Sequence, residues 1–174
     1  MKLPAIILAA LIATSSAKAQ TASAPPPNPC ADANHHAFDF WVGHWDVQPY
    51  AGGPVVAHSL IESLYGGCAI RENWMPIGKT GGGSLSNYDK GLGTWHQSWV
   101  DSAGSRVEFT GGMQGDAMVL TGLWGGVASG KDGLVRMTYT REKRGVRQKG
   151  DVSTDNGKTW APSFDLLYTR SAPG

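Results

Sequence analysis

The sequence lacks any hydrophobic run long enough to cross a bilayer comfortably. Its longest apolar stretch, residues 3–13, lies near the N-terminus, whereas a spanning helix needs about 20 apolar residues. A lysine precedes this stretch, and Ala17-Lys18-Ala19 after it matches the A-x-A pattern of signal-peptide cleavage. We therefore expect residues 1–19 to be a signal peptide and the protein to be periplasmic or secreted, with no membrane span. An uncleaved N-terminal anchor is the alternative.

The sequence also lacks an excess of charge of either sign. Its 15 lysines and arginines nearly balance its 14 aspartates and glutamates, and loss of Lys2 and Lys18 with the signal peptide changes the net charge from +1 to −1. Nucleic-acid-binding domains carry a clear basic excess, so nucleic acid is excluded as a partner. The basic residues between positions 136 and 149 are interrupted by Glu142, and we interpret them as a solvated hairpin face.

Cysteine is scarce, since only Cys30 and Cys68 are present. No C-x-x-C spacing indicates a redox or metal site. In an oxidising compartment such a pair forms a disulfide, and we predict a Cys30–Cys68 bond. The bond would tie a proline-rich lead-in, residues 20–34, to the folded body, and we expect this lead-in to be extended and disordered.

Motifs of several common enzyme classes are missing as well. No serine lies in a G-x-S-x-G elbow, and Gly78-Lys79-Thr80 lacks the upstream glycine of a P-loop. His35, His36 and His44 form a flexible surface group rather than a convincing metal site. The sequence therefore indicates no metal and no cofactor.

Turn signals, in contrast, are abundant. Many of the 24 glycines lie in turn-like clusters, at about the 8–12-residue spacing of successive antiparallel strands. The runs between them, such as RVEFT and LVRMTYT, are rich in β-branched and aromatic residues. We predict a single all-β domain, residues 35–174, folded as an antiparallel up-and-down β-barrel. Closing the barrel leaves no exposed strand edge.

The stretch WVGHWDV, residues 41–47, contains Gly43-x-Trp45 on the first predicted strand. This element resembles the G-x-W motif of the lipocalins and their calycin relatives. In those barrels the tryptophan closes one end, and an arginine from the last strand stacks over it. The resemblance implies that Trp45 and Arg170 form a structural plug of this kind.

A longer series of motifs covers nearly the whole mature chain: FDFWVGHWDV, GGCAIRENW, YDKGLGTWHQSWVD, VRQ and STDNGKTW. The series resembles a family of secreted bacterial calycin-like domains of unknown function. The resemblance implies a barrel of about ten strands with a cavity, and no particular reaction. Gly150 stands where an aromatic residue often follows the VRQ element, which is expected to loosen one strand or enlarge the cavity.

Residues 153–160 match the Asp-box pattern S-x-D-x-G-x-T-W, which occurs on hairpins of β proteins. We interpret the motif as a folding element rather than a glycan site. Asp155 would accept N–H groups of the turn, Gly157 would take a positive φ, and Trp160 would pack below.

Alternation with a period of two predicts which side chains face the interior of each strand. In residues 134–140 the pattern leaves two alternatives, because either Arg136 with Thr138 or the set Val135, Met137 and Tyr139 faces inward. In the other strands the apolar face is clearer. The polar and aromatic residues predicted there to face inward are Glu72, Trp74, Trp95, Gln97, Trp99 and Tyr168.

Such a lining suits a flat aromatic ligand with polar ends. A carboxyl group in an apolar cavity has a raised pKa, the usual condition for acid–base catalysis, and arginine holds a substrate carboxylate well. The predicted catalytic residues are Glu72, Arg136 and Tyr168. The predicted substrate-binding residues are Trp74, Trp95, Gln97 and Trp99.

Two classes of function fit this lining. One is a cofactor-independent enzyme, a lyase such as a decarboxylase or an isomerase, acting on a small aromatic compound. The other is a non-catalytic carrier of a small hydrophobic or aromatic molecule. A purely structural role is a third reading, in which Glu72 pairs with an inward arginine or glutamine in a packed core. The titratable interior favours the enzyme.

Overall fold

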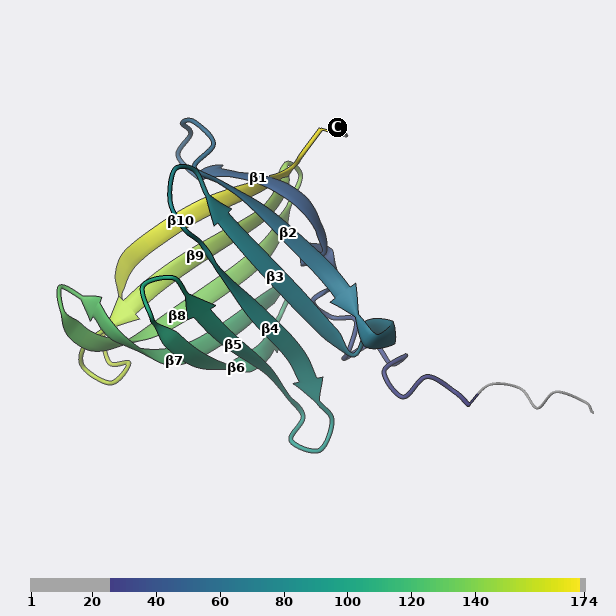
Figure 1. The fold of residues 1–174 in the computed structure, drawn as a ribbon. Coiled ribbons are helices and arrows are strands. Elements are labelled where there is room, and N and C mark those ends of the chain that lie inside the picture. Colours follow the sequence, from purple (N-terminus) through teal and green to yellow (C-terminus); the bar gives the residue numbers. More distant parts are fainter. Residues whose placement is uncertain (1–25, 173–174) are drawn as a thin grey trace, which may run out of the picture.

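The computed structural model describes residues 26–172, and the expected signal peptide lies outside this range. Ten strands form a closed antiparallel barrel, in which each strand pairs with its neighbours in sequence and β1 closes against β10 (Figure 1). The predicted all-β up-and-down barrel is confirmed. The strands are β1 (Gly43–Pro49), β2 (Ala57–Leu64), β3 (Ala69–Pro76), β4 (Gly82–Asp89), β5 (Thr94–Asp101), β6 (Arg106–Gln114), β7 (Ala117–Ala128), β8 (Lys131–Glu142), β9 (Gly145–Ser153) and β10 (Ala161–Arg170).

Helical structure within the described residues is confined to two single turns. The 3-10 helix η1 (Asp39–Trp41) precedes the first strand, and η2 (Tyr65–Gly67) connects β2 to β3. Among residues 26–172 no helix has the length and apolar character needed to cross a membrane. The strands therefore determine where almost every functional side chain lies.

The N-terminal segment fills one end of the barrel, which we call the closed end. Phe38 and Trp41 are fully buried there and stack with their ring centroids 4.9 Å apart. The indole Nε1 of Trp45 donates to the backbone oxygen of Trp41 at 2.8 Å. Burying large aromatic side chains is among the strongest apolar contributions that a small core can receive, so this segment is part of the fold.

The guanidinium of Arg170 lies 4.0 Å from the centroid of the Trp45 ring, as the G-x-W resemblance implies. The structure also explains the glycine of that motif. A Cβ atom at Gly43 would lie 1.5 Å from Nη1 of Arg170, and the φ of Gly43 is +149°. Gly43 therefore leaves the room in which the arginine stacks on the tryptophan.

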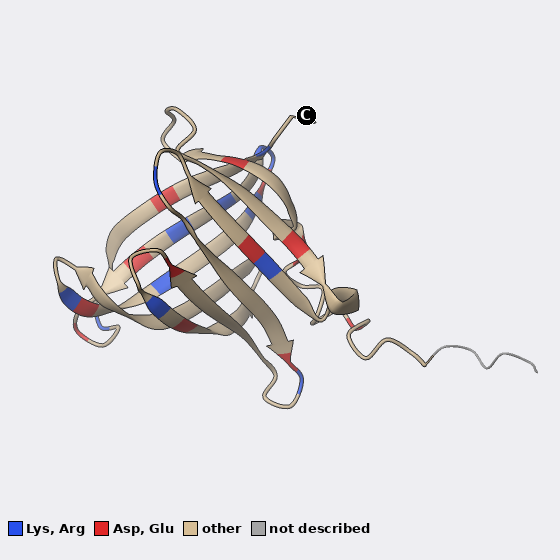
Figure 2. Cartoon of the chain, in the orientation of Figure 1, with Lys and Arg blue, Asp and Glu red and all other residues tan. Residues whose placement is uncertain are grey.

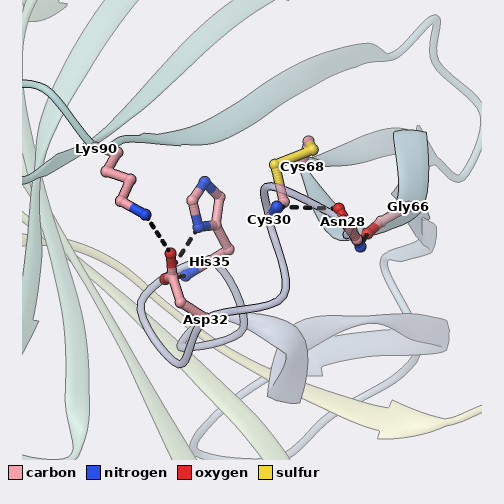
Figure 3. The surroundings of a disulfide bond; sticks show 7 residues. All are labelled: Asn28, Cys30, Asp32, His35, Gly66, Cys68 and Lys90. Atoms are coloured by element: carbon pink, nitrogen blue, oxygen red, sulfur yellow. Dashed lines mark hydrogen bonds and ion pairs between the residues drawn. A yellow bond between two sulfur atoms is a disulfide. The ribbon is translucent and has the colours of Figure 1, made fainter. Parts of the chain in front are cut away.

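The predicted Cys30–Cys68 disulfide is present and connects the N-terminal segment to the start of β3 (Figure 3). Asn28 reinforces the connection, because its side-chain Nδ2 donates to the carbonyl of Gly66 at 2.6 Å. Nearby, Asp32 forms an ion pair with Lys90 at 3.5 Å. Residues 28–34 of the predicted lead-in are thus held against the barrel, while residues 20–25 lie outside the described range.

In β8 the structure decides between the two predicted faces. Val135, Met137 and Tyr139 are buried inside the barrel, so Arg136 projects outward. Its guanidinium lies 4.2 Å from the centroid of the Trp160 ring and 3.3 Å from a carboxylate oxygen of Asp151. The predicted catalytic role of Arg136 inside the cavity is therefore wrong. The apolar set faces inward because it buries three large side chains.

The turn between β9 and β10 has the hydrogen bonds expected of an Asp-box. Asp155 accepts the backbone N–H of Thr159 at 2.9 Å, and Gly157 has a φ of +84°. The indole of Trp160 donates to the carbonyl of Gly157 at 3.1 Å. These bonds are internal to the turn, which supports its interpretation as a folding element.

Basic and acidic residues are both distributed over the strands and turns of the barrel (Figure 2). The basic residues of β8 and β9 follow this pattern, because Arg147 forms a bidentate hydrogen bond with Asp165 and Lys149 pairs with Asp151 at 2.9 Å. Their arrangement fits a solvated hairpin face.

Candidate functional site

A cavity of about 250 Å³ opens at the end of the barrel opposite the closed end. We call this opening the mouth; it is the end at which β3, β5 and β7 finish. Aromatic side chains surround the mouth, and polar side chains lie deeper. The lining residues are Glu72, Trp74, Gln97, Trp99, Phe109, Trp124, Met137, Tyr139, Gln148, Phe164, Leu166 and Tyr168.

Glu72 is the charged residue of this cavity. It lies on the inner face of β3 between Ile70 and Trp74, and its exposed fraction is 6%. The hydroxyl of Ser59 donates to Oε1 at 3.3 Å, and the hydroxyl of Ser84 donates to Oε2 at 3.1 Å. Both serines come from the strands that flank β3, so the sheet register itself places them.

Burial raises the pKa of Glu72 from 4.5 to about 7, because removal from water disfavours the charged carboxylate. The bonds from Ser59 and Ser84 act in the opposite direction, since they favour the charged form, but desolvation is the larger effect. No ion pair with Glu72 occurs within residues 26–172. The carboxyl group can therefore gain or lose a proton near neutral pH.

Two tyrosines and a glutamine form a second polar group in the cavity. Tyr168 donates its hydroxyl to Oε1 of Gln148 at 2.6 Å, and Nε2 of Gln148 donates to the hydroxyl oxygen of Tyr139 at 3.0 Å. Burial raises the pKa of both tyrosines well above 10, and the nearby charge of Glu72 adds to the shift. Both hydroxyl groups therefore stay protonated and serve as neutral donors.

The hydroxyl of Tyr139 gives its proton to a weak acceptor, and the amide of Gln97 lies in hydrogen-bond contact with the same hydroxyl. The Tyr139 hydroxyl donates to the thioether sulfur of Met137 at 3.4 Å, and a thioether is a poor acceptor compared with an oxygen. An oxygen atom of a bound molecule would be a better acceptor for this proton. Tyr139 is thus the hydroxyl of the cavity that is most available to a ligand.

Aromatic rings form the walls near the mouth. The ring of Trp124 lies 6.3 Å from both Trp99 and Phe109, measured between centroids. The ring of Phe164 lies over Gly150 on the neighbouring strand, where a Cβ atom would come within 2.3 Å of it. The space that Gly150 leaves is thus occupied by the ring of Phe164.

The cavity brings together most of the site residues predicted from sequence. Glu72, Trp74, Gln97, Trp99 and Tyr168 all line it. Trp95 does not, although its side chain is inward and buried, because it packs at the closed end, with its ring 5.8 Å from Phe38. Arg136 is outside the barrel.

Sequence reasoning missed several residues of the site. Tyr139 belonged to the ambiguous strand, and the three large apolar residues at alternate positions were the signal that favoured its inward face. Ser59 and Ser84 are small polar residues on inner faces, and their role depends on a cross-strand register that the sequence does not reveal. The other missed lining residues are Phe109, Trp124, Met137, Gln148, Phe164 and Leu166.

No group of three or more histidine, cysteine, aspartate or glutamate side chains among the described residues could hold a metal ion. Neither a protein-family profile nor a curated protein sequence matches this chain. The closed ten-stranded antiparallel barrel is compatible with a calycin-type fold.

Proposed function

We propose that the barrel takes a small aromatic compound into its cavity and that Glu72 transfers a proton to or from it, as in a cofactor-independent isomerase or lyase. The observation that carries this proposal is the position of the carboxyl group. Glu72 is buried at the cavity with only hydroxyl partners, beside the ring of Trp74. A carboxyl group whose pKa is raised in a cavity is a typical candidate for a general acid or base.

The proposed chemistry is a proton transfer at a carbon atom. The carboxylate of Glu72 takes a proton from a carbon next to a carbonyl group. The electron pair of the broken C–H bond forms the C=C bond of an enolate, and the π pair of the carbonyl group moves to its oxygen. The hydroxyl of Tyr139 donates a hydrogen bond to that oxygen as negative charge develops. When a C=C bond is conjugated with the enolate, the protonated Glu72 returns the proton to a different carbon as the carbonyl re-forms, which completes an isomerisation. When the neighbouring carbon carries a leaving group, the carbonyl re-forms as that group departs with its bonding pair and takes the proton from Glu72, which completes an elimination.

A decarboxylase receives less support from this cavity. A substrate carboxylate would bring a second negative charge close to Glu72, and like charges in a medium of low dielectric repel strongly. Arg136, which was expected to hold such a group, lies on the outside. We therefore restrict the proposed enzyme to proton transfer on substrates that are not anionic.

The experiment is deuterium exchange, which detects proton transfer whether or not a product accumulates. A panel of small aromatic ketones is incubated with the protein in D2O, and deuterium incorporation next to the carbonyl group is followed by NMR. Glu72→Gln keeps the shape of the side chain but removes its titration, and it should slow exchange by at least about 10²-fold. Glu62→Gln is the matched control, because Glu62 pairs with Arg71 on the outer surface. Equal exchange rates in the two variants would contradict the proposal.

A carrier is the second candidate, and the composition of the mouth favours it. Val56 and Ile77 are 37% and 56% exposed and lie in a surface hollow that includes Trp74. An exposed apolar patch beside a cavity is a typical route for a hydrophobic ligand. A carrier would bind the same compounds without exchange, and Glu72→Gln would then change the affinity alone.

The disulfide indicates an oxidising, extracytoplasmic environment. From this and the motif series we propose a periplasmic or secreted protein of the calycin-like family. Mass spectrometry of the mature protein tests the location, because cleavage after Ala19 predicts an N-terminus at Gln20.

A further inference from the structure

The cavity contains a negative group without a positive partner. Glu72 is the only acidic residue of the lining, and no lysine, arginine or histidine contributes to it in the part of the chain that the structure describes. Ser59 and Ser84 solvate the carboxylate but do not neutralise it. Buried charges are strongly unfavourable unless they are paired. A ligand that carries a cation would provide the pairing that the protein does not.

The carboxylate has hydrogen-bonding capacity to spare. Each of its two oxygen atoms accepts one serine hydroxyl, whereas an ionised carboxylate offers about four lone-pair sites in total. Glu72 also lines the cavity, so a bound molecule can reach it. An ammonium group has three N–H donors, two of which can use the two remaining sites.

The aromatic walls favour the same kind of ligand. Trp74 follows Glu72 on the inner face of β3, and its ring centroid lies 6.3 Å from that of Tyr168. The faces of such rings attract cations. Outside the cavity this chain already uses that contact, since Arg170 lies over Trp45 at the closed end and Arg136 lies over Trp160. No cation lies over the rings that line the cavity, as far as the described residues show.

We infer that the cavity selects a small aromatic amine, whose ammonium group pairs with the carboxylate of Glu72 and contacts the rings of Trp74 and Tyr168. This inference rests on the proposed uptake of a small aromatic compound and names the chemical class of that compound. The ring of the amine lies between the aromatic walls near the mouth. An acid of the same size is rejected, and an alcohol binds without the ion pair.

Binding of the amine changes the protonation of Glu72 in a way that depends on pH. Below neutral pH the free protein holds Glu72 as the neutral acid and the amine is already an ammonium ion, so one proton leaves Glu72 for the solvent when the complex forms. Above neutral pH the carboxylate is already ionised and no proton is released. The complex therefore contains Glu72 as the carboxylate, because the neighbouring ammonium group favours the ionised form.

Three ligands that share the 2-phenylethyl group separate the alternatives: 2-phenylethylamine, 2-phenylethanol and 3-phenylpropionate. Their affinities for the full mature protein are measured by isothermal titration calorimetry at pH 8. The amine should bind at least about tenfold more tightly than the alcohol, a difference of about 1.4 kcal/mol, and the acid should bind most weakly. At pH 5.5, titrations in two buffers of different ionisation enthalpy should show release of close to one proton per bound amine.

Two variants test whether Glu72 causes the preference for the amine over the alcohol. Glu72→Gln should reduce the affinity for the amine to that for the alcohol, while Glu62→Gln, on the outer surface, should change neither. Trp74→Leu supplies an independent test if Glu72→Gln does not fold. The loss of the ring should reduce the affinity for the amine at least about threefold more than the affinity for the alcohol. Equal losses of affinity would overturn the inference.

Each remaining outcome has one meaning. If the alcohol binds as tightly as the amine, or if the preference for the amine persists in Glu72→Gln, the inference fails and the proposed uptake of an aromatic compound stands. If none of the three ligands binds, the inference fails, and deuterium exchange with the ketone panel decides the proposed function separately. If the amine binds as expected but no compound exchanges deuterium, the inference holds and the carrier replaces the enzyme.

Discussion

Glu72 shows how one buried group links the chemistry of the cavity to the stability of the barrel. Its pKa is about 7 in the folded protein, against 4.5 in the unfolded chain. Between these pH values the folded state binds more protons at this group than the unfolded state does, so the stability contributed here is fully present below pH 4.5 and is lost as the pH rises to 7. The free energy lost is on the order of 3 kcal/mol.

Glu72→Gln should therefore remove a large part of the fall in stability between pH 5 and pH 8. Urea denaturation at the two pH values measures the change in the free energy of unfolding, with Glu62→Gln as the control. The wild type and Glu62→Gln should lose stability in parallel, and Glu72→Gln should lose less. A variant whose stability falls as steeply as that of the wild type would show that Glu72 is not the titrating group.

Arg170 is a second residue whose role can be isolated. Its guanidinium covers Trp45 at the closed end and does not line the cavity. Arg170→Ala should cost on the order of 1 kcal/mol of stability, the range of a partly desolvated cation–π contact, and leave ligand affinity unchanged. Thermal denaturation and calorimetry measure the two effects. A large loss of binding without loss of stability would show that this end of the barrel is itself a binding site.

At the level of elements, the N-terminal segment behaves as part of the core. Phe38 is fully buried against Trp41, Trp95 and Tyr139. Phe38→Ala should destabilise the protein by about 3–5 kcal/mol, the usual cost of removing a buried phenylalanine. Chemical denaturation measures the change. Tyr65→Ala is the control, because Tyr65 is 75% exposed and should cost little; similar losses in both variants would contradict the assignment.

The strands also show how much of the structure can be predicted from the sequence alone. Turn spacing and the alternation in β3, β5 and β10 correctly predict the barrel and five of the lining residues, because alternation and burial agree there. The prediction for Arg136 failed where both faces of a strand carry plausible inward residues. Trp95 shows a second limit, since alternation tells which way a side chain points but not how far along the barrel it lies.

For the molecule as a whole, the disulfide raises the free energy of unfolding because it restricts the conformations of the unfolded chain. The 38-residue separation between Cys30 and Cys68 corresponds to about 3–4 kcal/mol in the chain-entropy model. Denaturation of the non-reduced protein should reveal no free thiol. Replacing both cysteines with serine should lower stability by about that amount without opening the barrel. Two free thiols in the mature protein would contradict the bond.

The pairing of β1 with β10 has a consequence for the time course of folding. Every other ladder joins strands that follow one another in sequence, so each forms at the small entropic cost of closing a short turn. The pairing of Trp45 with Arg170 must bring together the two ends of the barrel sequence and should form last. Arg170→Ala should then accelerate unfolding while leaving the refolding rate nearly unchanged in stopped-flow experiments. The contact that closes the barrel would therefore also determine the rate at which the folded protein unfolds.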